Sequence, residues 1–251
     1  MLSDRKKTER PKTGIVIPCF NEELRLSGDS ILSFLEKSPD IHFCLVNDGS
    51  YDDTANLIEQ IAAKHDHIST VHLSRNMGKA EAVRRGILNL CEDKTFGFVG
   101  YWDADEATSF DEIHDFLGVF LNNEDLKIVL GSRIRRLGAD IQRKWYRHYL
   151  GRVFATISSI MLKMPVYDTQ CGAKMFKAEL AEELFRNPFL TKWIFDVEIL
   201  ARAAGFLKEG ICKSVYEHPL KKWEDKAFSH LRLNHYILAP KELYKIYKTY
   251  K

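Results

Sequence analysis

The sequence lacks the features that mark secreted, disulfide-bonded and membrane-spanning proteins. Its 251 residues include only five cysteines, and no two of them form a CxxC pair. An odd number of scattered cysteines is typical of reduced thiols and argues against a disulfide framework or a zinc knuckle. Residues 1–14 contain no apolar segment of the signal-peptide kind, and no stretch reaches the ~18 consecutive apolar residues of a spanning helix. We therefore expect a cytoplasmic protein.

The sequence also lacks an excess of positive or negative charge. The chain has 37 Lys and Arg residues against 35 Asp and Glu residues, a net charge of +2. This balance gives no electrostatic argument for a nucleic-acid partner, and we predict none. Basic and aromatic residues are interleaved only in residues 133–152 and 241–251.

Two segments leave open a peripheral contact with the cytoplasmic face of a membrane. A helix predicted over residues 145–164 begins with aromatic rings and arginines and continues with apolar residues. This pattern fits an interfacial helix and fits a core helix with a polar face equally well. The basic, aromatic helix predicted over residues 236–251 suits either anionic lipid or water.

The first half of the chain alternates apolar strands with amphipathic helices. Strands are predicted over residues 14–18, 41–46, 68–73, 96–102 and 127–131, and helices over residues 24–36, 53–64, 79–91 and 110–120. Strands that are apolar throughout and separated by helices predict an α/β fold with a mostly parallel sheet covered on both faces. The second half is less regular, with helices predicted over residues 145–164, 176–184 and 197–204. No linker interrupts the chain, so we predict a single domain.

Polar residues follow the predicted strands, at the sheet edge where α/β proteins bind ligands. In chain order, the first four strands are followed by Asn21 with Glu22, by Asp48, by Lys79, and by Asp103 with Asp105. Each group taken alone fits a turn or a helix cap. Two carboxylates two residues apart can also share a divalent cation, which would neutralise a departing diphosphate.

An ordered set of segments resembles the nucleotide-sugar half of family-two inverting glycosyltransferases. The segments read IVIPCFNEE, LVNDGSYDDT, NMGKAEAVRRGI and DAD. Three later segments, VLGSR, DTQCGAKMF and KWIFDVEIL, resemble dolichyl-phosphate β-glucosyltransferases and their bacterial polyprenyl-phosphate relatives. The similarity covers roughly residues 12–235. The resemblance implies the GT-A fold, a single domain with a Rossmann-like, mostly parallel central sheet flanked by helices.

The resemblance divides the chain by function. It implies a flexible leader at residues 1–11 and a glycosyltransferase domain at residues 12–235. Within the domain, residues 12–132 would bind the nucleotide sugar and residues 133–235 the acceptor. The remaining residues 236–251 form the basic aromatic C-terminal helix.

The resemblance also assigns roles on the donor side. The residues implied to hold the base and ribose, or to lie on the nucleotide side of the pocket, are Pro18, Asn21, Glu22, Asp48 and Lys79. Asp103 would contact the ribose or the metal, and Asp105 would be the main ligand of Mg²⁺ or Mn²⁺. The implied donor is a nucleoside-diphosphate sugar, with a UDP-sugar preferred over a GDP-sugar.

On the acceptor side, the resemblance implies that Arg133 meets the phosphates and that Gln170 faces the sugar or the acceptor. It places Asp196 and Glu198 near the acceptor. A hydroxyl acceptor needs a general base, for which Asp196 is the first candidate. A lipid phosphate is already an anion, and in that case Asp196 would organise Arg133 or a nearby lysine.

The implied reaction is inverting transfer of glucose or a similar hexose to a polyprenyl (dolichyl-type) phosphate. Relatives of this type tend to carry a G-S-K motif, where residues 223–230 here read WEDKAFSH. A sugar hydroxyl of a glycan or of a lipid-linked saccharide, in cell-surface polysaccharide synthesis, therefore remains the alternative acceptor. A nucleotidyltransferase is disfavoured, because the segment after the first strand is acidic and not a Gly-rich basic loop.

Overall fold

In the computed structural model, residues 11–143, 145–225 and 233–250 are described. Seven strands form one sheet in the order β3-β2-β1-β4-β7-β5-β8. They are β1 (Lys12–Cys19), β2 (Ile41–Asn47), β3 (Ile68–His72), β4 (Phe96–Trp102), β5 (Ile128–Ser132), β7 (Ala173–Lys177) and β8 (Val215–Pro219). Two short strands, β6 (Asp140–Gln142) and β9 (Lys222–Glu224), pair beside this sheet.

The sheet is parallel except at β7. Strands β3, β2, β1 and β4 pair in parallel, as do β5 and β8. β7 lies between β4 and β5 and is antiparallel to both. The predicted mostly parallel sheet is therefore confirmed, with one reversed strand near its middle.

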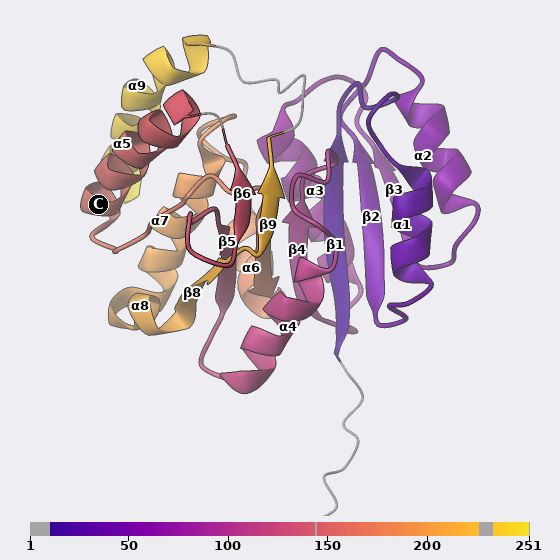
Figure 1. Cartoon of the computed structure of the whole chain (residues 1–251), viewed down its shortest axis with the longest axis horizontal. Coiled ribbons are helices and arrows are strands. Elements are labelled where there is room, and N and C mark those ends of the chain that lie inside the picture. The colour runs from indigo at the N-terminus through magenta and orange to yellow at the C-terminus, as the bar shows by residue number, and fades with distance from the viewer. Residues whose placement is uncertain (1–10, 144, 226–232, 251) are drawn as a thin grey trace, which may run out of the picture.

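Helices cover both faces of the sheet (Figure 1). Their bounds are α1 (Gly28–Leu35), α2 (Thr54–Ala62), α3 (Lys79–Glu92), α4 (Glu112–Asn122), α5 (Trp145–Leu162), α6 (Ala178–Phe185), α7 (Phe195–Leu207), α8 (Ile211–Ser214) and α9 (Leu233–Tyr250). Successive residues of β1 show the division: Ile15 and Ile17 pack with α1, α2 and α4, whereas Val16 packs with α3, α6 and α7. This is the two-sided burial that uniformly apolar strands require.

Helices α5 and α9 form an outer layer on α7. Leu243 and Ile246 of α9 pack with Val197 and Ala201 of α7, and Phe154 of α5 joins this group. The two outer helices lie side by side in Figure 1, at the edge of the molecule that carries the second half of the chain. Within the described residues, no helix combines the length and the apolar character needed to span a membrane.

The structure corrects two of the predicted helices. The helix predicted over residues 176–184 begins at Ala178, because residues 173–177 form β7. The helix predicted over residues 24–36 begins only at Gly28, where the Ser27 side chain caps it by accepting a hydrogen bond from the Ser30 amide. Strands β6, β8 and β9 were not predicted. Most of the predicted leader, and residues 226–230 of the stretch compared with the G-S-K motif, lie outside the described residues.

Candidate active site

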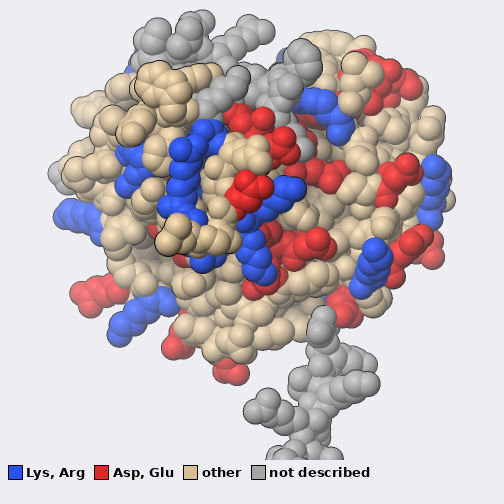
Figure 2. All heavy atoms as spheres, viewed as in Figure 1, with Lys and Arg blue, Asp and Glu red and all other residues tan. Residues whose placement is uncertain are grey.

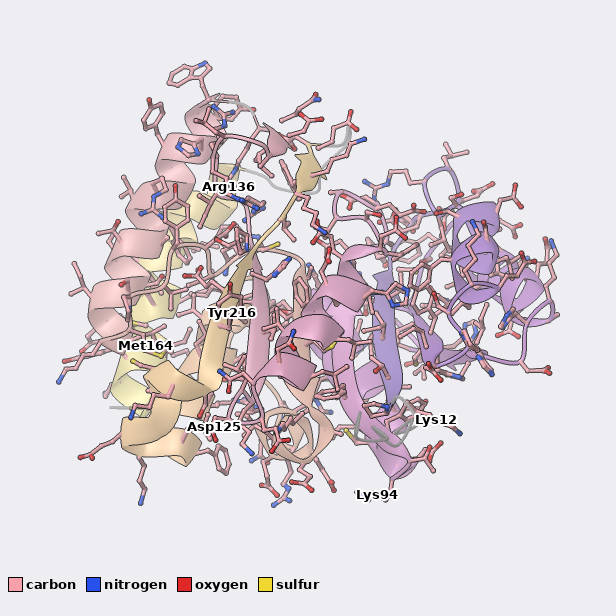
Figure 3. The ribbon with its side chains drawn as sticks, turned by 60° about the horizontal axis from the view of Figure 1, so that its bottom comes forward. Lys12, Lys94, Asp125, Arg136, Met164 and Tyr216 are labelled. Carbon is pink, nitrogen blue, oxygen red and sulfur yellow. The ribbon has the colours of Figure 1, made fainter. Side chains whose placement is uncertain are left out.

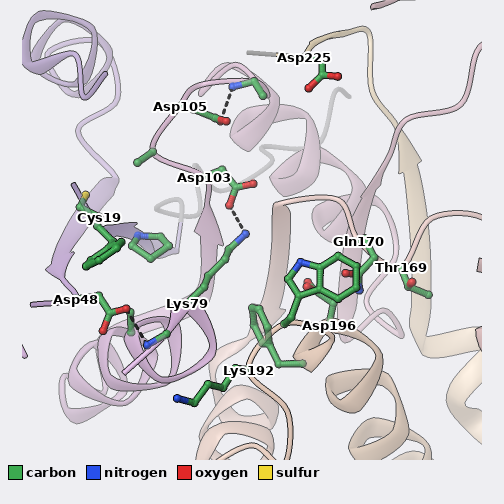
Figure 4. Close-up of a pocket in the computed structure, with 18 of the residues that line it drawn as sticks. Cys19, Asp48, Lys79, Asp103, Asp105, Thr169, Gln170, Lys192, Asp196 and Asp225 are labelled. Carbon is green, nitrogen blue, oxygen red and sulfur yellow. Dashed lines mark hydrogen bonds and ion pairs between the residues drawn. The ribbon is translucent and has the colours of Figure 1, made fainter. Parts of the chain in front are cut away.

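A cavity of about 380 Å³ lies beyond the carboxyl ends of β1, β2, β4 and β5. Its wall brings together most of the predicted site residues, from both halves of the chain. They are Pro18, Glu22, Asp48, Lys79, Asp103, Asp105, Arg133, Gln170 and Asp196. In Figure 4, Asp48, Lys79 and Asp103 line one side, and Thr169, Gln170 and Asp196 face them from the other. Acidic and basic side chains gather over this part of the surface (Figure 2).

Three carboxyl groups concentrate negative charge on the side of this cavity that is predicted to bind the donor. Burial raises the pKa of Asp105, and the neighbouring Asp103 raises it further. Burial likewise raises the pKa of Glu22 from 4.5 to about 7, although its ion pair with Arg25 opposes the shift. Ionising all three groups is therefore unfavourable unless a cation joins them.

The same carboxyl groups fit a divalent metal ion. Carboxylate oxygens are the hard ligands that Mg²⁺ and Mn²⁺ prefer. Glu22 Oε2 is buried and has no hydrogen-bond partner among the described residues, so its lone pairs are left uncompensated. The ammonium group of Lys79 forms an ion pair with Asp103 (Figure 4) and partly neutralises the cluster. Asp103 and Asp105 both line the cavity, and their role as metal ligands stays a prediction.

Asp103 is held against the loop that precedes β7. Its amide donates to the carbonyl oxygen of Gly172 at 3.0 Å. A Cβ atom at position 172 would lie 1.8 Å from Asp103 Oδ2, so only glycine leaves room for this carboxylate. The glycine of the DTQCG segment therefore fixes the position of the first carboxylate of the DAD segment.

Asp48 and Asn21 organise the neighbouring turns. The Asp48 carboxylate accepts hydrogen bonds from the amides of Met77 and Gly78, at 2.7 and 2.9 Å, and so holds the loop that leads into α3. Asn21 Oδ1 accepts from the Tyr51 amide at 2.9 Å. The structure does not place Asn21 among the residues that line the cavity. A role for Asp48 in binding the nucleotide stays a prediction.

Arg133 is held by a partner that the sequence analysis did not assign. Its Nε and Nη2 atoms donate to the two oxygens of Asp168 at 2.6 and 2.8 Å, a bidentate pair. Both side chains are nearly buried, and Arg133 keeps the pKa of Asp168 well below its ordinary value despite the effect of burial. The guanidinium also lies 5.2 Å from the ring centroid of Trp223. Arg133 therefore enters the cavity wall in a fixed orientation.

Asp196 belongs to a buried network that the sequence analysis also missed. Its Oδ1 atom accepts from the Tyr101 hydroxyl and, at 2.5 Å, from the ammonium of Lys174, which is fully buried. Lys174 also donates to the carbonyl oxygen of Cys171 at 2.6 Å. Lys174 lies on β7, a strand that the sequence analysis did not predict, so no sequence pattern indicated that it would point toward Asp196.

Two polar side chains of the same loop face the cavity without a partner. Thr169 Oγ1 and Gln170 Nε2 are buried, and neither has a hydrogen-bond partner in the described part of the chain. Both residues line the cavity, where a bound ligand would satisfy them. Gln170 thus occupies a position consistent with its predicted role.

Glu198, predicted to lie near the acceptor, is not among the residues that line the cavity. It is fully buried and accepts hydrogen bonds from the amides of Leu190 and Thr191, from Arg202 at 2.8 Å and from the Tyr250 hydroxyl at 2.9 Å. Helical spacing is the reason: Asp196 and Glu198 are two residues apart on α7, so they face different sides. Glu198 joins α7 to α9.

One face of helix α5 lines the cavity, and another face exposes a row of apolar side chains. Gly151, Phe154 and Ala155 line the cavity, together with Arg143 just before the helix. The exposed apolar side chains of α5 are Trp145, Tyr146, Tyr149, Leu150, Val153, Ile157 and Ile160. The helix is therefore neither wholly a core helix nor wholly an interfacial one.

Comparison with known proteins agrees with this geometry. The model of the family described as "Glycosyl transferase family 2" matches residues 14–185. The chain belongs to glycosyl transferase family 2. A dolichyl-phosphate beta-glucosyltransferase of Trichomonas vaginalis is 32% identical over 248 residues, covering 93% of this chain and 70% of that protein. One from Dictyostelium discoideum is 34% identical, covering 80% and 64%.

The predicted family is therefore confirmed, and this chain spans about two thirds of the length of these family 2 relatives. Solved structures share the fold. Glucosyl-3-phosphoglycerate synthase from Mycobacterium tuberculosis, in complex with Mn²⁺, UDP and glucosyl-3-phosphoglycerate, matches with a TM-score of 0.67 at 17% identity, over 95% of this chain and 79% of that one. Mannosyl-3-phosphoglycerate synthase from Rubrobacter xylanophilus matches with a TM-score of 0.68 at 18% identity, over 94% and 72%. These likenesses confirm the predicted GT-A fold.

Proposed function

We propose that this protein transfers glucose, with inversion, from a nucleoside-diphosphate sugar to a polyprenyl (dolichyl-type) phosphate. The observation that carries the proposal is one cavity in which the Asp103 and Asp105 carboxylates face the polar loop of Thr169 and Gln170. The names of the relatives, dolichyl-phosphate beta-glucosyltransferases, support both the sugar and the acceptor. A UDP-sugar is the preferred donor, in keeping with the UDP complex of the structural neighbour.

Asp105 and Asp103 would hold Mg²⁺ or Mn²⁺ on the donor diphosphate. The bound metal supplies Lewis-acid stabilisation of the leaving nucleoside diphosphate. Lys79, which now pairs with Asp103, is near enough to share that charge. Pro18, Glu22 and Asp48 would surround the nucleoside, on the wall formed by the ends of β1 and β2.

Arg133 and Asp196 would serve the acceptor side. The Nε and Nη2 atoms of Arg133 are hydrogen-bonded to Asp168, which leaves the Nη1 atom to donate to a phosphate. A phosphate acceptor needs alignment and charge screening but no proton removal. Asp196, already bonded to Lys174 and Tyr101, would then position the acceptor site. With a sugar hydroxyl as the alternative acceptor, Asp196 would act as general base.

The exposed apolar row of α5 would contact the cytoplasmic face of a membrane. The row flanks the part of α5 that lines the cavity, so a lipid acceptor could reach the cavity from the bilayer. Arg135 and Arg136 lie in the loop between β5 and β6 and would favour anionic headgroups.

A product assay separates the two acceptors. The protein would be incubated with UDP-glucose or GDP-mannose and Mn²⁺, with either polyprenyl phosphate in vesicles or a hydroxyl-bearing saccharide acceptor. Transfer from UDP-glucose to polyprenyl phosphate alone, abolished by chelation of the metal, is the expected result. Transfer to the saccharide alone would replace this proposal with the alternative, and transfer to neither would reject both.

Vesicle sedimentation tests the membrane contact. The double variant Ile157→Ser, Ile160→Ser should bind anionic vesicles several-fold less than the unchanged protein. Leu121→Ser, which changes an exposed leucine of α4, is the matched control and should bind normally. Equal binding by all three proteins would remove α5 from the membrane contact.

A further inference from the structure

Three potential metal ligands meet away from the cavity, between α4 and β8. Glu112 and Asp115 lie one turn apart on α4, and His218 lies on β8. Their ligand atoms all lie within 4.8 Å of one another. None of the three lines the donor cavity. Figure 3 shows α4 beside β8, the strand that carries the labelled Tyr216.

Two of these ligand atoms are buried without a hydrogen-bond partner. Glu112 is 4% exposed, and its Oε1 atom accepts from the Lys221 amide at 2.9 Å. Its Oε2 atom and His218 Nε2 are both buried, and neither has a hydrogen-bond partner among the described residues. They lie 3.2 Å apart, an ion pair when His218 is protonated, but do not have the geometry of a hydrogen bond. Such orphaned atoms are uncommon in native proteins and call for a missing partner.

The separation of these atoms fits a transition metal. Zinc bonds to imidazole nitrogen and carboxylate oxygen at about 2.0–2.2 Å, which sets adjacent tetrahedral ligands about 3.3 Å apart. The observed 3.2 Å matches that edge. One imidazole and two carboxylates also suit Zn²⁺ better than Mg²⁺, which prefers oxygen ligands alone. We propose that Glu112, Asp115 and His218 form a Zn²⁺-binding site separate from the donor site.

Lys221 competes for part of this site. Its ammonium lies 2.6 Å from Asp115 Oδ2, and its side chain is 64% exposed. An exposed lysine can swing into water when a divalent ion takes its place, at the cost of one ion pair. Lys221 therefore weakens metal binding, although its amide orients Glu112 for it.

The three ligands of the proposed site come from both halves of the chain. Glu112 and Asp115 belong to the half predicted to bind the donor, and His218 to the half predicted to bind the acceptor. With its ligands drawn from a helix and a strand, Zn²⁺ here would act as a structural cross-link and raise the temperature of unfolding. This inference does not depend on the proposed reaction.

Calorimetric titration of the full chain with Zn²⁺, together with thermal unfolding, tests the proposal. The unchanged protein and Asp105→Asn, which alters only the donor site, should show the same high-affinity zinc isotherm. His218→Gln should bind at least tenfold more weakly and should lose the zinc-dependent rise in unfolding temperature. Lys221→Met should bind several-fold more tightly.

Two results would overturn the site. One is a His218→Gln isotherm equal to that of the unchanged protein, and the other is loss of the high-affinity isotherm in Asp105→Asn. If His218→Gln does not fold, Glu112→Gln replaces it with the same expected loss. Lys221→Met provides an independent test, because unchanged or weaker binding by that variant contradicts the competition that the structure predicts.

Discussion

The two sides of the cavity, the proposed donor side and the proposed acceptor side, are built in different ways. On the donor side, Glu22, Asp48 and Asp103 follow β1, β2 and β4, and the parallel pairing of these strands brings them to one edge of the sheet. On the acceptor side, Arg133 and Asp196 are oriented by buried partners, Asp168 and Lys174, that lie far away in the sequence. The regular sheet therefore places most of the donor side, with Gly172 as its contact from the second half of the chain, whereas the acceptor side depends on buried ion pairs.

The largest expected effect comes from changing Asp105, the proposed metal ligand on the donor side. Asp105→Asn should reduce transfer at saturating substrate by about a hundredfold or more, because the diphosphate loses its charge stabilisation. Initial rates over a range of Mn²⁺ concentrations check this. Asp111→Asn changes an exposed carboxylate outside the cavity; it is the control and should keep full activity. An Asp105→Asn variant with more than half of the activity would remove Asp105 from the mechanism.

The next prediction tests the contact between Gly172 and Asp103, which joins the donor side to the loop before β7. Gly172→Ala places a methyl group on the Asp103 carboxylate and should lower the rate of transfer by about tenfold or more, since small displacements of a reacting group are costly. Gly205→Ala on α7, where an added Cβ meets nothing within 4 Å, should leave the rate unchanged. Its helix should be about 0.5–1 kcal/mol more stable. Equal rates for the two variants would contradict a positioning role for Gly172.

On the acceptor side, loss of a buried ion-pair partner should lower the free energy of unfolding. Lys174→Met leaves the buried Asp196 carboxylate without its cation and should cost about 3–5 kcal/mol of the free energy of unfolding. Urea unfolding measures this. The double variant Lys174→Met, Asp196→Asn removes both charges and should recover at least half of the loss. No recovery would show that packing of the lysine, and not its charge, stabilises this region.

The smallest effect concerns the pH dependence of the donor side. The folded protein raises the pKa of Glu22 from 4.5 to about 7, so it holds this proton more tightly than the unfolded chain does. This contribution to the free energy of unfolding is complete below about pH 4.5. It falls by up to about 3 kcal/mol as the pH rises to about 7, and it stays constant at higher pH. Glu22→Gln should flatten that slope in urea unfolding at pH 5 and 8.

Glu23→Gln is the matched control for this pH dependence. Glu23 lies next to Glu22 in the chain but is exposed, so its substitution should leave the slope unchanged. Added Mn²⁺ should lower the apparent pKa of Glu22 if this carboxyl group shares the charge of Asp103 and Asp105. A slope that persists in Glu22→Gln would assign the titration to another group.

Much of the fold and of the donor side could be predicted from the sequence. β4 was predicted over the residues it occupies, and the carboxylates after it line the cavity as expected. One prediction failed at residues 173–177, where residues 176 and 177 had been placed in a helix and residues 173–175 in no element. Residues 173–177 form a strand because a place in the sheet between β4 and β5 pairs their backbone on both sides. Periodicity over five residues does not distinguish such a strand from a buried helix.

The sequence by itself determined the family, the α/β architecture and the strand-end carboxylates, because each of these depends on local pattern and order along the chain. Only the tertiary structure decided the partners of Arg133 and Asp196, the burial of Glu198 and the meeting of His218 with α4. These contacts join residues from about 20 to 100 positions apart, and no local pattern records which distant side chain will share a buried charge.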